Sequence, residues 1–144
     1  MIRAAVMGKP HTAALVETAH PTPGPGEVLV KVAYVGLCGS DLELLHGTSL
    51  CDVDGRAAFP HRLGHERVGA VEELSPVVTG PRPGEVVTGF TTISCQTCRS
   101  CATDHRNLCT ELREIGFYGR TGAVAAEYLP MPRHARAPDP TGRR

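Results

Sequence analysis

Four cysteines in the second half of the chain offer a ligand set for a metal ion. They are Cys95, Cys98, Cys101 and Cys109, and their spacing is C-x2-C-x2-C-x7-C. Four thiolates in so short a segment can close a tetrahedral zinc site, because zinc accepts sulfur ligands and imposes little geometry of its own. Such a site leaves no position for a substrate. We therefore expect a structural zinc that orders a lobe spanning residues 94–110.

Disulfides and an iron–sulfur cluster are alternative uses of the same cysteines. The cytosol keeps thiols reduced, and two-residue gaps are more typical of metal sites than of disulfides. The usual [4Fe–4S] run ends with a three-residue gap and a Cys-Pro pair, whereas Thr110 follows Cys109 here after a gap of seven. His105 could replace one cysteine, but four thiolates already complete the site. The spacing favours zinc.

A second group of candidate ligands lies in two short motifs farther upstream. Gly36-Leu37-Cys38-Gly39-Ser40-Asp41 follows an apolar run, and Leu63-Gly64-His65-Glu66 precedes another. A lone cysteine or histidine is more often part of a core than a metal ligand. Together with the four-cysteine segment, the two motifs become more specific.

Short strands and turns must position these residues, because 16 glycines and 12 prolines interrupt the 144-residue chain throughout. A helix is expected at Ser40–His46, with Ser40 as its N-cap, Glu43 completing a capping box and Gly47 ending it. The proline-rich tail from Pro130 is expected to be frayed. Many short strands predict a β-barrel or sandwich. The expected strands are Ile2–Val6 and Ala13–Thr18 as a hairpin, then Val28–Val35, Arg67–Leu74, Glu85–Phe90 and Ala123–Leu129.

Composition argues against several classes of partner. Lys plus Arg equals Asp plus Glu, at 15 each, so no basic excess favours nucleic acid. The longest stretch without charge, Val86–Cys98, is shorter than the roughly 18 apolar residues that a membrane helix needs. The first ten residues lack the apolar segment of a signal peptide, so we expect a cytosolic protein that does not bind membranes. No G-x-G-x-x-G fingerprint marks a dinucleotide-binding domain.

The motifs resemble those of the zinc-dependent medium-chain dehydrogenases, the family of alcohol, polyol and sugar dehydrogenases. The resemblance runs from Met1 to about Pro140. It implies that residues 1–140 form the family's N-terminal GroES-like domain, a mostly β, distorted and partly open barrel with short helices and a structural-zinc lobe, and that residues 141–144 are a tail. The matching segments are Gly36–Asp41, Gly64-His65-Glu66, Gly84-Glu85-Val86-Val87, the cysteine segment with Asn107-Leu108-Cys109, and Ala126-Glu127-Tyr128.

The resemblance also implies roles for the upstream motifs. Cys38 and His65 would ligate a catalytic zinc, which lowers the pKa of a substrate hydroxyl so that hydride can pass to NAD or NADP. Ser40 would pass the proton toward solvent, and Asp41 would hydrogen-bond the far nitrogen of His65. Glu66 would sit beside the metal. Ser40 and Asp41 also have a simpler explanation as residues that favour a helix N-terminus.

The family's third catalytic-zinc ligand and its Rossmann domain lie beyond the segment that these 144 residues match. We therefore expect the portion of an NAD(P)-dependent dehydrogenase that holds zinc, acts on a small alcohol, polyol or sugar, and is inactive alone. A full-length form could be a homo-oligomer. The alternatives are a stand-alone zinc-binding module without catalysis and a degenerate truncated product.

Overall fold

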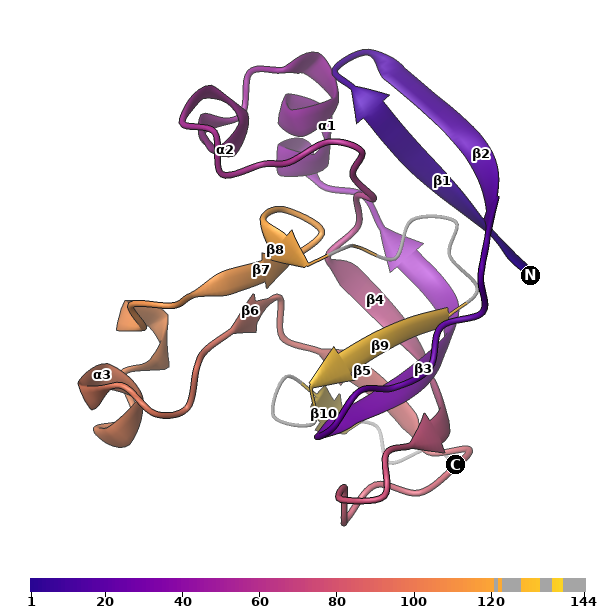
Figure 1. Cartoon of the computed structure of the whole chain (residues 1–144), viewed down its shortest axis with the longest axis vertical. Helices are drawn as coiled ribbons and strands as arrows, with labels where there is room; N and C mark the ends of the chain where they lie inside the picture. The colour runs from indigo at the N-terminus through magenta and orange to yellow at the C-terminus, as the bar shows by residue number, and fades with distance from the viewer. Residues whose placement is uncertain (121, 123–127, 133–135, 139–144) are drawn as a thin grey trace.

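The computed structural model describes residues 1–120, 122, 128–132 and 136–138, which form three sheets with short helices between them (Figure 1). A hairpin pairs β1 with β2, a five-stranded sheet has the order β10-β5-β4-β3-β9, and a small sheet has the order β6-β7-β8. The strands are β1 Ile2–Lys9, β2 Thr12–Thr18, β3 Glu27–Gly36, β4 Glu66–Leu74, β5 Val86–Gly89, β6 Thr92–Ile93, β7 Arg113–Ile115, β8 Gly119–Arg120, β9 Tyr128–Pro132 and β10 Arg136–Pro138. The helices are α1 Gly39–His46, α2 Leu50–Val53, α3 Arg99–Ala102 and the 3-10 turn η1 Arg106–Leu108.

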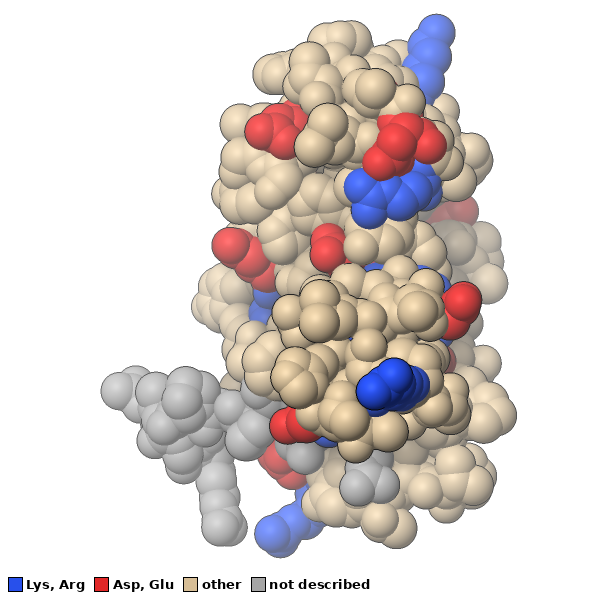
Figure 2. Space-filling view, turned by 90° about the vertical axis from the view of Figure 1, so that its left-hand side faces the viewer, with Lys and Arg blue, Asp and Glu red and all other residues tan. Residues whose placement is uncertain are grey.

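The fold is mostly β, as expected, and its main sheet curls into a partly open barrel (Figure 1). The lobe that carries α3 projects to one side of this barrel. No doubly wound parallel sheet of the nucleotide-binding kind occurs among the residues placed here. Within the same residues, no helix has the length and apolar character needed to cross a membrane. On the face shown in Figure 2, basic and acidic residues are interspersed without a continuous field of either sign.

Strand β3 forms where the alternating valines predicted a strand, and it lies next to the β9 edge of the main sheet. It pairs antiparallel with β4 on one side and with β9 on the other. Val28 and Val30 are buried in the main core while Lys31 is exposed, as a period of two predicts, although Leu29 between the two valines is buried as well. The main core consists of Val28, Val30, Val71, Val87, Ile93, Ile115 and Met131.

The predicted N-terminal hairpin is confirmed, and both of its strands are as long as or longer than expected. β1 and β2 pair antiparallel, with Ile2 opposite Thr18. Buried Met7, near the end of β1, joins a second core cluster with Leu44 of α1 and Phe117. This second cluster lies under the loops that carry the upstream site residues.

Helix α1 starts one residue earlier than predicted, and the expected Ser40–Glu43 capping box is wrong. Cys38 is the N-cap, and Asp41 completes the capping box by accepting the Cys38 N–H at 3.1 Å. An acidic residue at the third helical position can do what Glu or Gln does in the usual motif. Gly47 ends the helix as expected, with a positive φ of 69° that glycine adopts without strain.

The expectation of a frayed tail from Pro130 is wrong for the part that the structure places. Strands β9 and β10 form the two edges of the five-stranded sheet. Proline is tolerated on edge strands because one side of such a strand needs no N–H donor. Only Tyr128 and Leu129 of the expected strand Ala123–Leu129 are described. Residues 123–127 and the expected tail 141–144 lie outside the described residues.

Candidate metal centres

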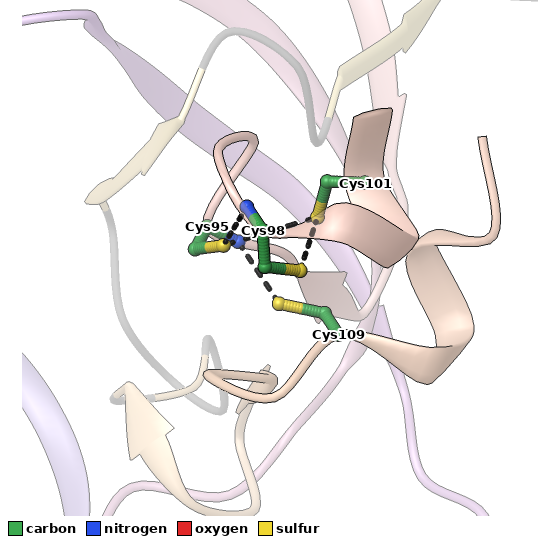
Figure 3. A group of neighbouring side chains, drawn as sticks. All are labelled: Cys95, Cys98, Cys101 and Cys109. Atoms are coloured by element: carbon green, nitrogen blue, oxygen red, sulfur yellow. Dashed lines mark hydrogen bonds between the residues drawn. The ribbon is translucent and has the colours of Figure 1, made fainter. Parts of the chain in front are cut away.

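The first candidate centre lies in the projecting lobe, where four cysteine side chains converge (Figure 3). Cys95 follows β6, Cys98 and Cys101 lie at the start and within α3, and Cys109 follows η1. The Sγ atoms of Cys98 and Cys101 are 3.5 Å apart, and those of Cys95 and Cys101 are 3.9 Å apart. All four sulfurs lie within 4.8 Å of one another. A tetrahedral zinc with bonds near 2.3 Å separates its sulfurs by about 3.8 Å, so the arrangement fits zinc.

Hydrogen bonds prepare one of these thiols to carry negative charge. The Cys95 Sγ accepts the Thr97 hydroxyl at 3.5 Å, the Thr97 N–H at 3.4 Å and the Cys98 N–H at 3.3 Å. These contacts, led by the Thr97 hydroxyl, lower the pKa of Cys95 to about 6. Cys95 can therefore be a thiolate at neutral pH before any cation arrives.

Cys101 behaves in the opposite way. Desolvation, aided by the neighbouring Cys98 sulfur, raises the pKa of Cys101 to about 11. The Cys101 thiol therefore keeps its proton at neutral pH unless a bound cation displaces that proton. A cluster in which one thiol ionises easily and another resists ionisation is consistent with a site whose remaining proton is displaced when a divalent metal binds.

The lobe has almost no apolar core of its own. Cys109 is the one buried residue between positions 95 and 109, and the side chain of Leu108 is 62% exposed. The segment also contains only one short helix and one 3-10 turn. Ligand bonds would therefore supply the cross-links that apolar packing supplies elsewhere in the molecule.

The second candidate centre forms where the start of α1 meets the start of β4. The Cys38 Sγ lies 3.2 Å from the His65 Nε2, although the two residues are 27 positions apart. The Ser40 hydroxyl oxygen lies 3.1 Å from the same sulfur. Cys38, Asp41 and His65 each offer a ligand atom within 4.8 Å of the others. One thiolate, one imidazole and one carboxylate are donor types that zinc accepts.

Asp41 ties the two halves of this second centre together. Its carboxylate is 1% exposed and accepts the N–H of Cys38 at 3.1 Å and the N–H of Gly64 at 3.0 Å. Its Oδ2 lies 3.6 Å from the Nδ1 of His65, which is longer than a hydrogen bond, and Nδ1 has no hydrogen-bond partner. Asp41 thus holds the backbone of Cys38 and the backbone just before His65, and its carboxylate lies close to the imidazole without a hydrogen bond to it.

Phe117 packs on the imidazole of His65. The two ring centroids are 4.7 Å apart, with the rings tilted by 51°. Phe117 is itself held in the second core cluster with Met7 and Leu44. Nothing in the sequence distinguished Phe117, because its contact with His65 depends on how the chain returns from the four-cysteine lobe.

Glu66 occupies the first position of β4 and is exposed. Its carboxylate lies against Gly36, where a Cβ atom would collide with it, two residues before Cys38. The carboxylate does not belong to the group of ligand atoms that Cys38, Asp41 and His65 form. Glu66 is therefore next to the second centre rather than within it in this structure.

Arg67 is a buried cation beside the second centre that sequence reasoning missed. Its Nη1 donates to the His65 carbonyl at 2.6 Å, and its Nη2 donates to the Phe90 carbonyl at 3.2 Å. Burial lowers the pKa of Arg67 to about 10, so the guanidinium keeps its charge at neutral pH. The alternation of more and less buried residues along β4 could have indicated that Arg67 is buried. Its contacts with two backbone carbonyls could not have been foreseen.

Comparison with known sequences identifies the domain type and similar proteins. Residues 24–140 match the model of the alcohol dehydrogenase GroES-like domain. The starvation-sensing protein RspB of Escherichia coli (strain K12) is 34% identical over 131 residues, which cover 91% of this chain and 37% of RspB. L-threonine 3-dehydrogenase of Pyrococcus horikoshii is 37% identical over 120 residues, covering 83% of this chain and 33% of that enzyme.

The solved structure of an NAD-dependent alcohol dehydrogenase has the same fold. It superposes with a TM-score of 0.85 and 31% identity, over 99% of this chain and 41% of that protein. The chain thus spans about a third of the length of the curated relatives that it matches.

Proposed function

This chain belongs to the zinc-dependent medium-chain dehydrogenases through its alcohol dehydrogenase GroES-like domain, and from that membership we propose that it is the zinc-holding portion of an NAD(P)-dependent alcohol, polyol or sugar dehydrogenase. The proposed assignments are a structural zinc at Cys95, Cys98, Cys101 and Cys109, and a catalytic zinc at Cys38 and His65. The observation that carries the catalytic assignment is the 3.2 Å approach of the Cys38 Sγ to the His65 Nε2 across 27 residues of sequence. That approach joins two motifs that are weak separately.

Zinc, when bound, supplies a positive charge that lowers the pKa of an alcohol hydroxyl, and the nicotinamide accepts the hydride. The residues of this chain have supporting tasks. The Cys38 side chain accepts the N–H of Asp41 within the capping box, which holds the sulfur at the start of α1. Phe117 and the His65 backbone orient the imidazole, so that Nε2 faces Cys38.

Ser40 is the proposed proton carrier. Its hydroxyl oxygen lies 3.1 Å from the Cys38 sulfur. A substrate oxygen bound to a cation at Cys38 would therefore lie near this hydroxyl. The side chain is half-buried and can pass a proton outward. Ser40 is free for this task because Cys38, and not Ser40, caps α1.

Asp41 is proposed to set the orientation of His65 through the backbone. With Nδ1 of His65 3.6 Å away, a small movement on binding of a cation would bring the carboxylate into hydrogen-bonding distance. Glu66, against Gly36, is the exposed carboxylate that can approach the same centre from the solvent side. Cys38 and His65 are two ligands, one fewer than the three protein ligands that catalytic zinc sites use.

The relatives are more than twice as long as this chain, and we propose that the third ligand and the nicotinamide site lie in the part of them that it does not cover. These 144 residues would then bind zinc but not turn over substrate. The competing proposal is a zinc-binding module without catalysis, which the self-contained ligand set of the four-cysteine lobe favours.

Metal analysis and turnover together test the proposal. After dialysis we expect one firmly held zinc per chain and a second that is held weakly. Cys98→Ser should remove the first and His65→Ala the second. A panel of secondary alcohols and polyols with NAD and NADP should give no turnover with this chain and turnover with an extended version that restores the length of its relatives.

Several results would contradict the proposal. An extended version that stays inactive although it is fully loaded with zinc would favour the non-catalytic module. Retained activity in an extended His65→Ala variant would refute the ligand role of His65. Two firmly held zincs in these 144 residues would show that the second centre lacks no ligand.

A further inference from the structure

Arg67 is a charged residue that the fold keeps in its interior without an acidic partner. The residue is 6% exposed, and no described Asp or Glu forms an ion pair with it. Its side chain donates to two backbone carbonyls, those of His65 and Phe90, and its Nε has no hydrogen-bond partner in the described part of the chain. Because burying a cation without a countercharge costs free energy, we expect the buried Arg67 to have a structural or functional role that offsets this cost.

The niche around the guanidinium depends on Gly89 of β5. A Cβ atom at Gly89 would lie 2.5 Å from the Arg67 Nη2 and 2.7 Å from the Met131 Cε. The backbone of Gly89 does not adopt a positive φ, so chain conformation does not require glycine there. The absence of a Cβ atom at Gly89 instead leaves room for the Arg67 side chain.

The two carbonyls lie just past the point where β4 and β5 stop pairing. The ladder between the strands runs from Ala70 opposite Val86 to Val68 opposite Thr88. Beyond it, the Thr88 hydroxyl donates to the Arg67 carbonyl at 2.9 Å, and the guanidinium then connects the His65 carbonyl to that of Phe90. Side chains thus continue the connection between the two strands for several residues after backbone bonds have ended.

His65 needs this support because its ring has few anchors. Among the described residues, its Nδ1 has no hydrogen-bond partner and lies 3.6 Å from the Asp41 carboxylate, and its Nε2 faces Cys38, so the Phe117 ring and the backbone are the main supports of the imidazole. We propose that Arg67 is a positioning residue for the second centre: its planar fork holds the His65 backbone to Phe90 and so keeps the imidazole facing Cys38. The inference rests on the proposed function in taking Cys38 and His65 as metal ligands. A lysine could not replace the fork, because an ammonium is a single point of donation.

Cobalt binding tests the inference in the chain as it exists. With the four-cysteine site filled by zinc, cobalt is titrated, and the cobalt–thiolate absorption that Cys38→Ser removes is assigned to the second centre. We expect Arg67→Met and Gly89→Ala each to weaken that binding by about 10-fold, the lower end of what loss of an outer partner of a ligand costs. Arg67→Lys should not restore it. Arg62→Met is the matched control, since Arg62 is half-buried, its Nε has no hydrogen-bond partner among the described residues and it forms no hydrogen bond with His65, and it should bind cobalt like the wild type.

A double variant separates a shared cause from general damage. If Gly89→Ala acts by displacing Arg67, adding it to Arg67→Met should cause no further loss of cobalt affinity. Additive losses would overturn the inference. If Arg67→Met does not fold, Gly89→Ala carries the test, since alanine there leaves the backbone conformation allowed and crowds the guanidinium and the Met131 methyl group, of which only the guanidinium contacts His65.

The histidine ring resonances supply a readout without metal in the second centre. The His65 signals, assigned by their loss in His65→Gln, should shift and broaden in Arg67→Met and Gly89→Ala and stay unchanged in Arg62→Met. Wild-type His65 signals and wild-type cobalt affinity in a folded Arg67→Met variant would overturn the role of Arg67. Failure of Cys38→Ser to alter cobalt binding would instead overturn the proposed metal site, and the ring resonances would still decide whether Arg67 positions His65.

Discussion

The four-cysteine lobe and the Cys38–His65 centre are built by opposite means. In the lobe, all ligands come from 15 consecutive residues, only Cys109 is buried, and local N–H groups and a hydroxyl prepare the Cys95 sulfur. At the second centre, the ligands come from two separate loops that a sheet, a buried carboxylate and a core cluster hold in place. The difference suggests that metal creates the order of the first centre, whereas the fold creates the order of the second.

The largest expected effect separates the two centres by mutation. Cys98→Ser should unfold the lobe, because three sulfurs cannot replace a complete ligand set where no apolar core exists. Hydrogen exchange of the amides between Cys95 and Cys109 should then reach nearly unprotected rates. Cys38→Ser should change the free energy of unfolding by less than about 1 kcal/mol, since serine also caps helices well. Equal loss of protection in both variants would remove the distinction.

Chelation should divide the centres without a mutation. A mild chelator should remove any ion from Cys38 and His65 and leave amide protection intact, because Asp41 and the core cluster hold that geometry. Only a stronger chelator that strips the four thiolates should expose the lobe. Amide exchange measured alongside zinc release checks the order of events, and loss of lobe protection before zinc leaves would contradict it.

Asp41→Ala should produce an intermediate effect, confined to the second centre. The substitution leaves the N–H groups of Cys38 and Gly64 without their acceptor, each at a cost of about 1–3 kcal/mol. We expect the free energy of unfolding to fall by about 2–6 kcal/mol in a denaturant titration. Asp41→Asn, which keeps one acceptor oxygen, should lose less. Lobe protection should not change in either variant, and a change there would show that the two regions are coupled.

The smallest effect concerns pH. His61 is buried beside β1, and desolvation lowers its pKa below the usual 6.5. The unfolded chain therefore takes up a proton first as the pH falls through 6.5, so stability decreases with falling pH until the folded state is protonated as well. His61→Gln should flatten this part of the stability curve. An unaltered curve in His61→Gln would show that burial of His61 does not matter.

The sequence predicted those features that local patterns determine. The alternating valines of β3, the apolar runs of the hairpin and the glycine at the end of α1 each act within a few residues. The C-x2-C-x2-C spacing likewise indicated the lobe, because its ligands are neighbours in sequence. The strands β6, β7 and β8 were missed because segments of two or three residues are too short to show a period.

The second centre was less accessible to the same reasoning. Cys38 and His65 were selected through a family resemblance, since no local pattern brings residues 27 positions apart together. Phe117, Gly89 and Arg67 escaped notice because their importance depends on packing between β4, β5 and the chain that returns from the lobe. The N-cap was misassigned because Cys38 took a role that composition statistics give to Ser40.

The double attachment of the Asp41 carboxylate also bears on how ions enter and leave. Its two oxygens accept the N–H groups of Cys38 and Gly64 and so join the start of α1 to the turn before β4, which means that hydrogen bonds of the fold itself hold the sulfur near the imidazole. The loss of chain entropy needed to assemble the donors then occurs during folding and is not repeated at each binding event. Ions can therefore exchange at this position on the timescale of ligand substitution rather than that of segmental reordering.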